Sequence, residues 1–304
     1  MRRIFLLIVT SLLGTQVAYA QQVLTSFKPI QMITQELTKN VTEPDVLLAA
    51  NTSPHDYALR PSDVKRINHA DLVIWFGPTL EPFLSKTLEN RENTFTISEV
   101  PHLDLLEFEH HDEHEHEHEH EHEHEHGDGH DHGRFNPHFW LGHEQTLTMA
   151  RALTAKLISI DSTHSEQYQK NLAEFEDNLN QTFAEIDLKL EPVREKGYYV
   201  FHDAYEYFEK DHQLNNLGHF TVSPERKPGA KTLISIRNAL SSSNAQCVFA
   251  EPQFTPAIVE SVVRGTQARI GTLDPIGTEI NIADGSYFVF LDSLANHFND
   301  CLSQ

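Results

Sequence analysis

The feature that most constrains the fold is an alternation of short apolar runs with helical segments, which occurs twice along the chain. The runs are rich in Val, Leu, Ile and Phe. They lie at residues 23–26, 45–50, 71–77 and 94–98, and again at 198–202, 218–222, 246–250 and 269–273. Continuous apolar strands separated by helices are typical of parallel sheets covered on both faces. The chain is therefore predicted to be an α/β protein with two parallel sheets of four strands each.

A longer helical pattern separates the two groups of strands. Seven apolar residues from Tyr168 to Leu190 step by three or four positions, which places them on one stripe of a helix. Residues 164–191 would extend roughly 42 Å as a helix, enough to cross the back of both halves. We predict a rigid linker helix in 161–192 that joins an N-terminal α/β domain (21–160) to a C-terminal α/β domain (193–304) and limits the opening of the cleft between them.

Shorter helices separate or follow the strands. They are predicted at residues 29–40, where apolar residues have helical spacing, at 61–70, which starts with Pro, and at 229–241, 255–265 and 287–301.

The first 20 residues have the pattern of a secretory signal peptide. Arg2 and Arg3 precede a short apolar run, and Ala18-Tyr19-Ala20 fits a small-x-small cleavage signal. The apolar run is too short to span a membrane. We therefore expect residues 1–20 to be removed and the mature chain to be soluble in an extracytoplasmic space, which the resemblance described below narrows to the periplasm.

The chain contains two cysteines, Cys247 and Cys301. An exported protein permits a disulfide between them, while two free buried thiols are the alternative. Their spacing does not match a zinc knuckle, in which the cysteines lie two to four residues apart.

Residues 111–133 read HDEHEHEHEHEHEHEHGDGHDHG. Eleven of the 21 histidines lie at 110–132 and 11 acidic residues lie at 109–131, and the net charge of the whole chain is −22. Such a charge argues against nucleic acid as a partner. With no apolar residue to bury, segment 109–133 is expected to be a disordered loop. Its neutral imidazoles would offer several weak, interchangeable zinc sites; a solvated acidic loop without a metal role is the alternative.

Three other histidines lie where an α/β fold binds ligands. His55 follows the strand at 45–50, His202 ends the strand at 198–202, and His138 lies near the junction of the two halves. Ligands of open α/β sheets bind outside the carboxyl ends of the strands. Three imidazoles in a cleft would suit tetrahedral Zn²⁺. Position alone does not select these three, because single histidines form no strict motif.

Longer motifs, in a fixed order along the chain, carry a family resemblance. They are SPHDYALRPSDVKRI (53–67), NPHFWL (136–141), GYYVFHDAYEYFE (197–209), CVFAEPQFTPAIVESVVRGT (247–266) and GTLDPIGTEI (271–280). The chain resembles the ZnuA-type family of zinc-binding receptors that serve bacterial metal ABC transporters. The resemblance covers residues 21–304 and implies a two-domain α/β receptor with the metal in the cleft between the domains.

The resemblance also implies particular residues and partners. It implies His55, His138 and His202 as zinc ligands, with Asp274 or water in the fourth position, and a disulfide between Cys247 and Cys301. It implies a monomer that binds Zn²⁺ without catalysis and delivers it to a membrane-embedded ABC permease. The His/Glu-rich run would then be an accessory that captures or senses zinc. The sequence does not give the affinity, the release trigger or the number of ions on the run.

Some alternatives remain open at this stage. A zinc hydrolase or lyase would need a catalytic motif, and no H-E-x-x-H is present. A periplasmic zinc buffer would need no permease, and an adhesin would need a surface anchor. Additional polar groups near the site are also candidates, either as partners of the ligands or, for His219, as a further ligand: Asp56, Asp203, His219 and Glu251.

Overall fold

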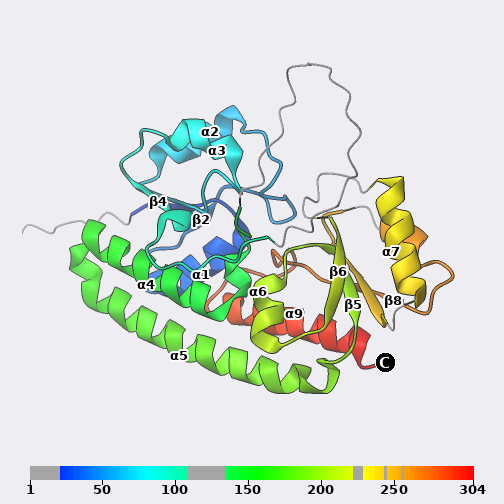
Figure 1. The fold of residues 1–304 in the computed structure, drawn as a ribbon. Coiled ribbons are helices and arrows are strands. Elements are labelled where there is room, and N and C mark those ends of the chain that lie inside the picture. Colours follow the sequence, from blue (N-terminus) through cyan, green and yellow to red (C-terminus); the bar gives the residue numbers. More distant parts are fainter. Residues whose placement is uncertain (1–20, 109–133, 222–228, 243–244, 255–256) are drawn as a thin grey trace, which may run out of the picture.

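The computed structural model describes residues 21–108, 134–221, 229–242, 245–254 and 257–304. The predicted signal peptide (1–20) and the His/Glu-rich run (109–133) lie outside these ranges. Two four-stranded sheets form the framework of the molecule (Figure 1). The predicted α/β fold with two parallel sheets is therefore confirmed.

The first sheet has the strand order β2-β1-β3-β4, and all of its strands are parallel. The strands are β1 (Val23–Thr25), β2 (Asp45–Val46), β3 (Leu72–Trp75) and β4 (Thr94–Thr96). Strand β2 is shorter than the predicted run at 45–50. Two backbone bonds still tie Leu47 and Leu48 to the end of β1, and the chain then turns at Ala49–Thr52 toward His55.

The second sheet repeats this arrangement with the order β6-β5-β7-β8, again all parallel. Its strands are β5 (Tyr198–His202), β6 (Asn216–Thr221), β7 (Cys247–Ala250) and β8 (Arg269–Thr272). Each lies within two residues of its predicted run. In both sheets the first strand of the half lies in the centre, so its carboxyl end is flanked by loops from its neighbours.

Nine α-helices occur in the described residues. They are α1 (Lys28–Thr38), α2 (Pro61–His69), α3 (Pro82–Leu88), α4 (His143–Ile160), α5 (Ser165–Leu190), α6 (Glu206–His212), α7 (Ala230–Ser242), α8 (Ala257–Val263) and α9 (Ser286–Leu302). The sequence pattern did not predict α3, α4 and α6. Helices α3 and α6 have only seven residues each, too few for a clear helical period, and the equally short α8 was predicted only within a longer segment at 255–265.

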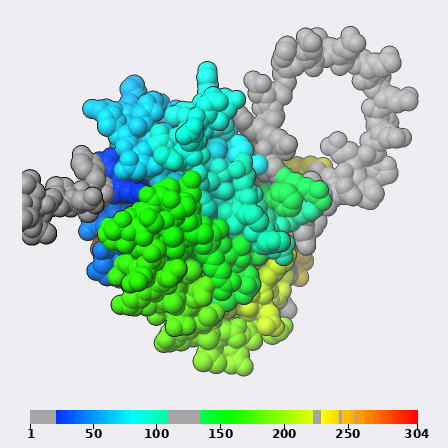
Figure 2. Space-filling model, turned by 90° about the vertical axis from the view of Figure 1, so that its left-hand side faces the viewer, coloured from blue at the N-terminus to red at the C-terminus, as the bar shows by residue number. Residues whose placement is uncertain are grey.

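Helix α5 is the predicted linker helix. Short 3₁₀ turns adjoin it at Ser162–His164 and Glu191–Val193. It contacts α1 and α4 of the N-terminal half and α6 and α9 of the C-terminal half. Figure 1 shows it running along the bottom of the molecule, antiparallel to α4. In the side view of Figure 2, the green surface of α4 and α5 lies directly beneath the blue and cyan N-terminal elements.

Alternate residues of the strands face two different hydrophobic clusters. In β3, Leu72 and Ile74 belong to a large central cluster, while Val73 and Trp75 belong to a smaller outer one. In β7, Cys247 and Phe249 belong to that same central cluster, while Val248 and Ala250 face another outer one. One face of each sheet therefore packs into a single core that both halves share.

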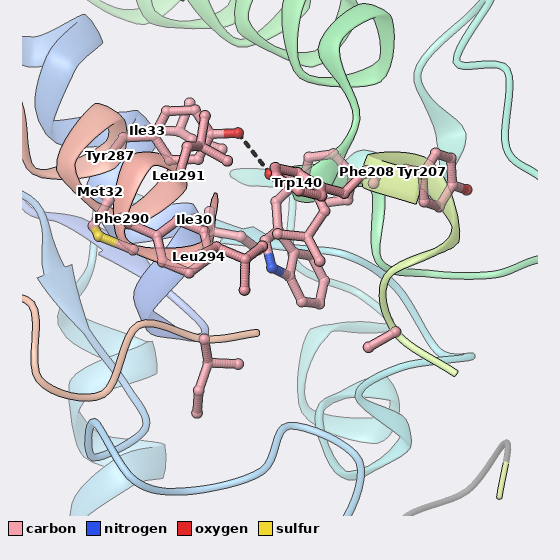
Figure 3. Packing of buried hydrophobic residues seen from close by; sticks show 14 of the residues in the cluster. Ile30, Met32, Ile33, Trp140, Tyr207, Phe208, Tyr287, Phe290, Leu291 and Leu294 are labelled. Carbon is pink, nitrogen blue, oxygen red and sulfur yellow. Dashed lines mark hydrogen bonds between the residues drawn. The ribbon is translucent and has the colours of Figure 1, made fainter. Parts of the chain in front are cut away.

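Helices α1 and α9 fill the middle of this shared core. Figure 3 shows Ile30, Met32 and Ile33 of α1 facing Tyr287, Phe290, Leu291 and Leu294 of α9, with Trp140 beside them. The Tyr287 hydroxyl donates a hydrogen bond of 2.6 Å to the Trp140 carbonyl oxygen. Because α1 comes from the first half of the chain and α9 from the second, these contacts join the two halves.

The end of α9 is joined covalently to the second sheet. Cys247 at the start of β7 and Cys301 form a disulfide across a sequence separation of 54 residues. The predicted pairing is thus confirmed, and it fixes the C-terminal helix to the strand that leads to Glu251. No helix in the described part of the chain is both long enough and apolar enough to cross a membrane.

Candidate metal centre

The loop after β2 presents His55. The loop is stabilised at its far end, where the Tyr57 hydroxyl donates to Asp63 Oδ2 over 2.8 Å and the Arg60 amide donates to the same oxygen over 2.8 Å. Asp63 is buried in the first turn of α2, so these bonds attach the loop to that helix. The imidazole of His55 is partly buried and lines a small cavity between the two halves.

His138 lies in the segment that leads into α4, and only 2% of it is exposed. Its Nδ1 lies 2.7 Å from Asn136 Oδ1, which also accepts a hydrogen bond of 3.1 Å from the His138 backbone amide. An amide oxygen only accepts hydrogen bonds, so it selects the tautomer of His138 with the proton on Nδ1. The other ring nitrogen, Nε2, is then an acceptor, as a metal ligand must be.

His202 is the last residue of β5 and is also 2% exposed. Its Nδ1 lies 3.6 Å from Oε1 of Glu251, the residue directly after β7. Strands β5 and β7 are neighbours in the sheet, so adjacent strand ends bring the imidazole and the carboxylate together. A buried carboxylate beside the imidazole of a metal ligand helps to orient its ring.

The three histidines meet although they come from three separate segments. One ring nitrogen from each lies within 4.8 Å of the others, and they form a possible metal-binding group in the described residues. Their ring centroids are separated by 5.5 Å (His55 to His138), 5.3 Å (His55 to His202) and 4.8 Å (His138 to His202). A tetrahedral zinc ion with bonds near 2.1 Å needs nitrogens about 3.4 Å apart, so small ring movements would complete such a site.

The cavity between the histidines is the size of an ion rather than of an organic ligand. Its volume is about 20 Å³, the space of one water-sized sphere. Its remaining walls include Trp140, Glu251, Gln253, Pro275 and Ile276.

Burial affects the protonation state of the histidines at the site. Burial lowers the pKa of His138 well below its ordinary value of 6.5, and the neighbouring His202 and His55 lower it further. His138 is therefore a neutral imidazole near pH 7, which is the form that binds metal ions. Three imidazole nitrogen donors are a set that suits Zn²⁺ better than Mn²⁺.

Other predicted polar residues lie elsewhere. Asp56 is exposed, and Asp203 Oδ2 lies 3.5 Å from Nδ1 of His219, outside the cavity. Asp274, the candidate fourth ligand, does not line the cavity either. Its Oδ1 accepts hydrogen bonds from Gln253 Nε2 (2.8 Å) and the Ile276 amide (3.2 Å), and its Oδ2 accepts one from the Thr278 amide (2.5 Å). Asp274 therefore organises its own loop in this structure.

Three residues at the site were not identified from the sequence: Asn136, Trp140 and Gln253. Asn136 and Trp140 lie within the NPHFWL motif, of which only His138 was predicted to be a site residue. Trp140 Nε1 donates to the Pro275 carbonyl oxygen over 2.7 Å, which connects the His138 segment to the loop of Asp274. Asn136, two residues before His138, was the one residue of the three that the sequence could have suggested as a partner of a ligand. The side-chain contacts of Trp140 and Gln253 depend on distant segments.

Comparisons with known proteins identify the family and the fold. The family described as "ZnuA: Zinc-uptake complex component A periplasmic" matches residues 23–301. The chain is 44% identical over 290 residues to the high-affinity zinc uptake system protein ZnuA of Yersinia pestis, covering 92% of this chain and 91% of the relative. It is 41% identical over 301 residues to the protein of the same description from Haemophilus ducreyi, covering 97% of each chain. A crystal structure of ZnuA shares the fold with a TM-score of 0.77 at 23% identity, covering 93% of this chain and 100% of that one.

Proposed function

The chain belongs to the family of periplasmic ZnuA components of zinc-uptake complexes, and on this premise we propose that it captures Zn²⁺ and delivers it to an ABC permease. The observation that carries the proposal is the meeting of His55, His138 and His202, whose ring nitrogens lie within 4.8 Å of one another. These three imidazoles are the proposed ligands of the transported ion. Binding and release are sufficient for this role, so no turnover of a substrate is expected.

The proposed ligands come from both halves of the chain, which suits a receptor. His55 lies in the loop that follows β2 of the first sheet, and His202 ends β5 of the second, while His138 lies where the chain passes from one half to the other. A zinc ion would therefore bridge the two halves and tighten their contact. A permease that separates the halves slightly would remove a ligand and weaken binding, which is a physical route to release.

Two segments outside the described residues, 1–20 and 109–133, have roles in the proposed function. We assign residues 1–20 as the signal peptide that directs the chain to the periplasm, where it acts as a monomer. We assign the His/Glu-rich run at 109–133 as an accessory that collects zinc in weaker sites. Binding sites tethered to the same chain raise the local concentration of the ion.

The test of the central site is zinc competition against a chromophoric chelator. The unmodified protein should show one tight site, and His202→Ala should lose it while the weak binding remains. His219→Ala is the matched control, since this histidine of the same sheet does not line the cavity. Tight binding that persists in H202A would exclude His202 as a ligand.

The accessory role has its own experiment. Deleting residues 110–132 should lower the number of zinc ions bound per chain and leave the tight site unchanged. Loss of the tight site on deletion would show that the run contributes ligands to it. Delivery is tested by zinc-dependent growth on low-zinc medium of a strain that lacks this protein and is complemented with each variant. Growth with H202A equal to that with the unmodified chain would contradict a role in uptake.

A further inference from the structure

The loop after β8 contains a carboxylate next to residues that line the cavity, but it does not line the cavity itself. Asp274 precedes Pro275 and Ile276, which both line the cavity, whereas Asp274 itself does not. Two backbone amides of its own loop and the side chain of Gln253 donate hydrogen bonds to its two oxygens. Hydrogen bonds to an ionised carboxylate are stronger than those between neutral groups. Asp274 would have to give up several of them to reach an ion held by the histidines.

Gln253 is the contact between the cavity wall and Asp274. It lines the cavity together with His55, His138 and His202. Its Nε2 donates to Asp274 Oδ1 over 2.8 Å and to Thr278 Oγ1 over 2.9 Å, so both amide protons are used on the Asp274 loop. Its Oε1 is buried and accepts no hydrogen bond from the described residues. The amide therefore restrains Asp274 with its nitrogen, and its oxygen remains available as an acceptor.

Whether Asp274 reaches the ion decides the chemistry of the site. Three imidazoles and a water form a neutral donor set, which suits Zn²⁺. Adding a carboxylate makes the set harder and anionic, which favours Mn²⁺ relative to the first set. The fourth donor is thus the position at which this receptor would distinguish between the two ions.

We propose that Gln253 is a specificity-determining residue that keeps Asp274 out of the coordination shell of the bound ion. The fourth position is then left to water, and Gln253 Oε1 accepts a hydrogen bond from that water. The inference rests on the proposed function, since it requires the ion to bind at the three histidines. It assigns Gln253 a positioning role and no contact with the metal.

The first experiment compares Zn²⁺ and Mn²⁺ affinities by chelator competition in Gln253→Met. This change retains the length of the side chain and removes both the donor and the acceptor. The ratio of Zn²⁺ to Mn²⁺ affinity should fall roughly 10-fold, the lower range for the loss of an outer-shell partner. In Gln253→Met combined with Asp274→Asn the ratio should return toward that of the unmodified chain, because the carboxylate is gone.

A purely structural role of Gln253 predicts a different result. The two affinities would then fall together in Q253M, and the second substitution would restore nothing. Thr278→Val is the matched control, because it removes the hydroxyl that also accepts from Gln253 Nε2 while the Thr278 amide still bonds Asp274. It should leave the affinity ratio within about twofold of the unmodified value. An unchanged ratio in Q253M, with tight zinc binding retained, would overturn the proposal but not the zinc-receptor function.

The second experiment needs no substitution and decides the matter if Q253M does not fold. X-ray absorption at the zinc edge and a crystal structure of the zinc-loaded protein should show three imidazoles and a water on zinc, with Asp274 still bonded to Gln253. A zinc–carboxylate bond from Asp274 would overturn the inference. Absence of a tight zinc site in the unmodified protein would instead refute the proposed function, so the two failures are distinguishable.

Discussion

At the scale of single residues, the site is organised by side chains that need not touch the ion. Asn136 fixes the tautomer of His138, and Glu251 lies against the ring of His202. Both partners are buried, so the rings they contact lie in a protected, low-dielectric environment. The binding geometry is thus prepared before an ion arrives, which reduces the ordering cost of binding.

Asn136→Ala tests this preparation. The substitution removes the acceptor for His138 Nδ1, so zinc affinity should fall about 10- to 100-fold in the chelator competition assay. Glu206→Gln is the control, since Glu206 accepts from Asn136 Nδ2 over 3.2 Å and a glutamine can do the same. E206Q should keep the affinity of the unmodified chain. An N136A protein that binds zinc as tightly as E206Q would contradict the role of Asn136.

Glu81 gives a residue-scale prediction about pH. Its Oε2 accepts hydrogen bonds from the amides of Phe76 (2.8 Å) and Gly77 (3.1 Å), and burial raises the pKa of its carboxyl to about 7 from an ordinary value near 4.5. Between these pH values the folded protein holds a proton that the unfolded chain has released. The contribution of the protonated Glu81 carboxyl to the stability of the folded protein is therefore complete below pH 4.5 and is lost as the pH rises through 7.

Glu81→Gln isolates this contribution. The free energy of unfolding of the unmodified chain, relative to E81Q, should decrease by up to about 3 kcal/mol between pH 5 and pH 8. Urea unfolding of both proteins, at several pH values and without metal, measures the difference. Parallel pH profiles would show that Glu81 does not titrate differently in the folded state.

At the scale of helices and strands, the pattern of apolar residues explains which elements could be predicted from the sequence. The strands at 198–202 and 246–250 are continuous apolar runs, so sequence alone locates β5 and β7 to within one residue. The short helices α3 and α6 lack the length for a period, and their positions are determined by tertiary packing. The three histidines follow from strand ends and motifs, whereas the role of Gln253 depends on a loop 21 residues away.

Helix α5 allows a matched test within one element. Phe175 is 1% exposed, and its ring contacts those of Tyr287 and Phe288 on α9. Phe175→Ala should lower the free energy of unfolding by about 3–5 kcal/mol, because it leaves a cavity between the two helices. Leu188 lies on the same helix but is 71% exposed. Leu188→Ala should therefore change the free energy of unfolding by about 0.5 kcal/mol or less. Urea denaturation measures the free energy of unfolding of both variants. Similar losses in the two variants would contradict the prediction that one stripe of α5 is buried.

At the scale of the whole molecule, the two halves have separate sheets but one central core. Residues of β1, β3, β5 and β7 all belong to that core, together with α1, α5 and α9. Opening the molecule widely would expose this apolar surface to water, at about 25 cal/mol for each Å². We therefore expect small adjustments around the three histidines rather than a large hinge motion, and we expect the two proposed domains to unfold together.

Native-state hydrogen exchange tests this cooperativity directly. The slowest amides of β3 in the first sheet and β7 in the second should exchange with the same free energy, to within about 0.5 kcal/mol, because both need the shared core to unfold. Zinc at 100 times its dissociation constant should add about 2.7 kcal/mol to both values, since an ion held by both halves is lost only when that core opens. Amides of the loop around His55 should exchange more easily and serve as an internal comparison. If zinc protected one sheet and left the other unchanged, the halves would be independent units, and the ion could not couple them.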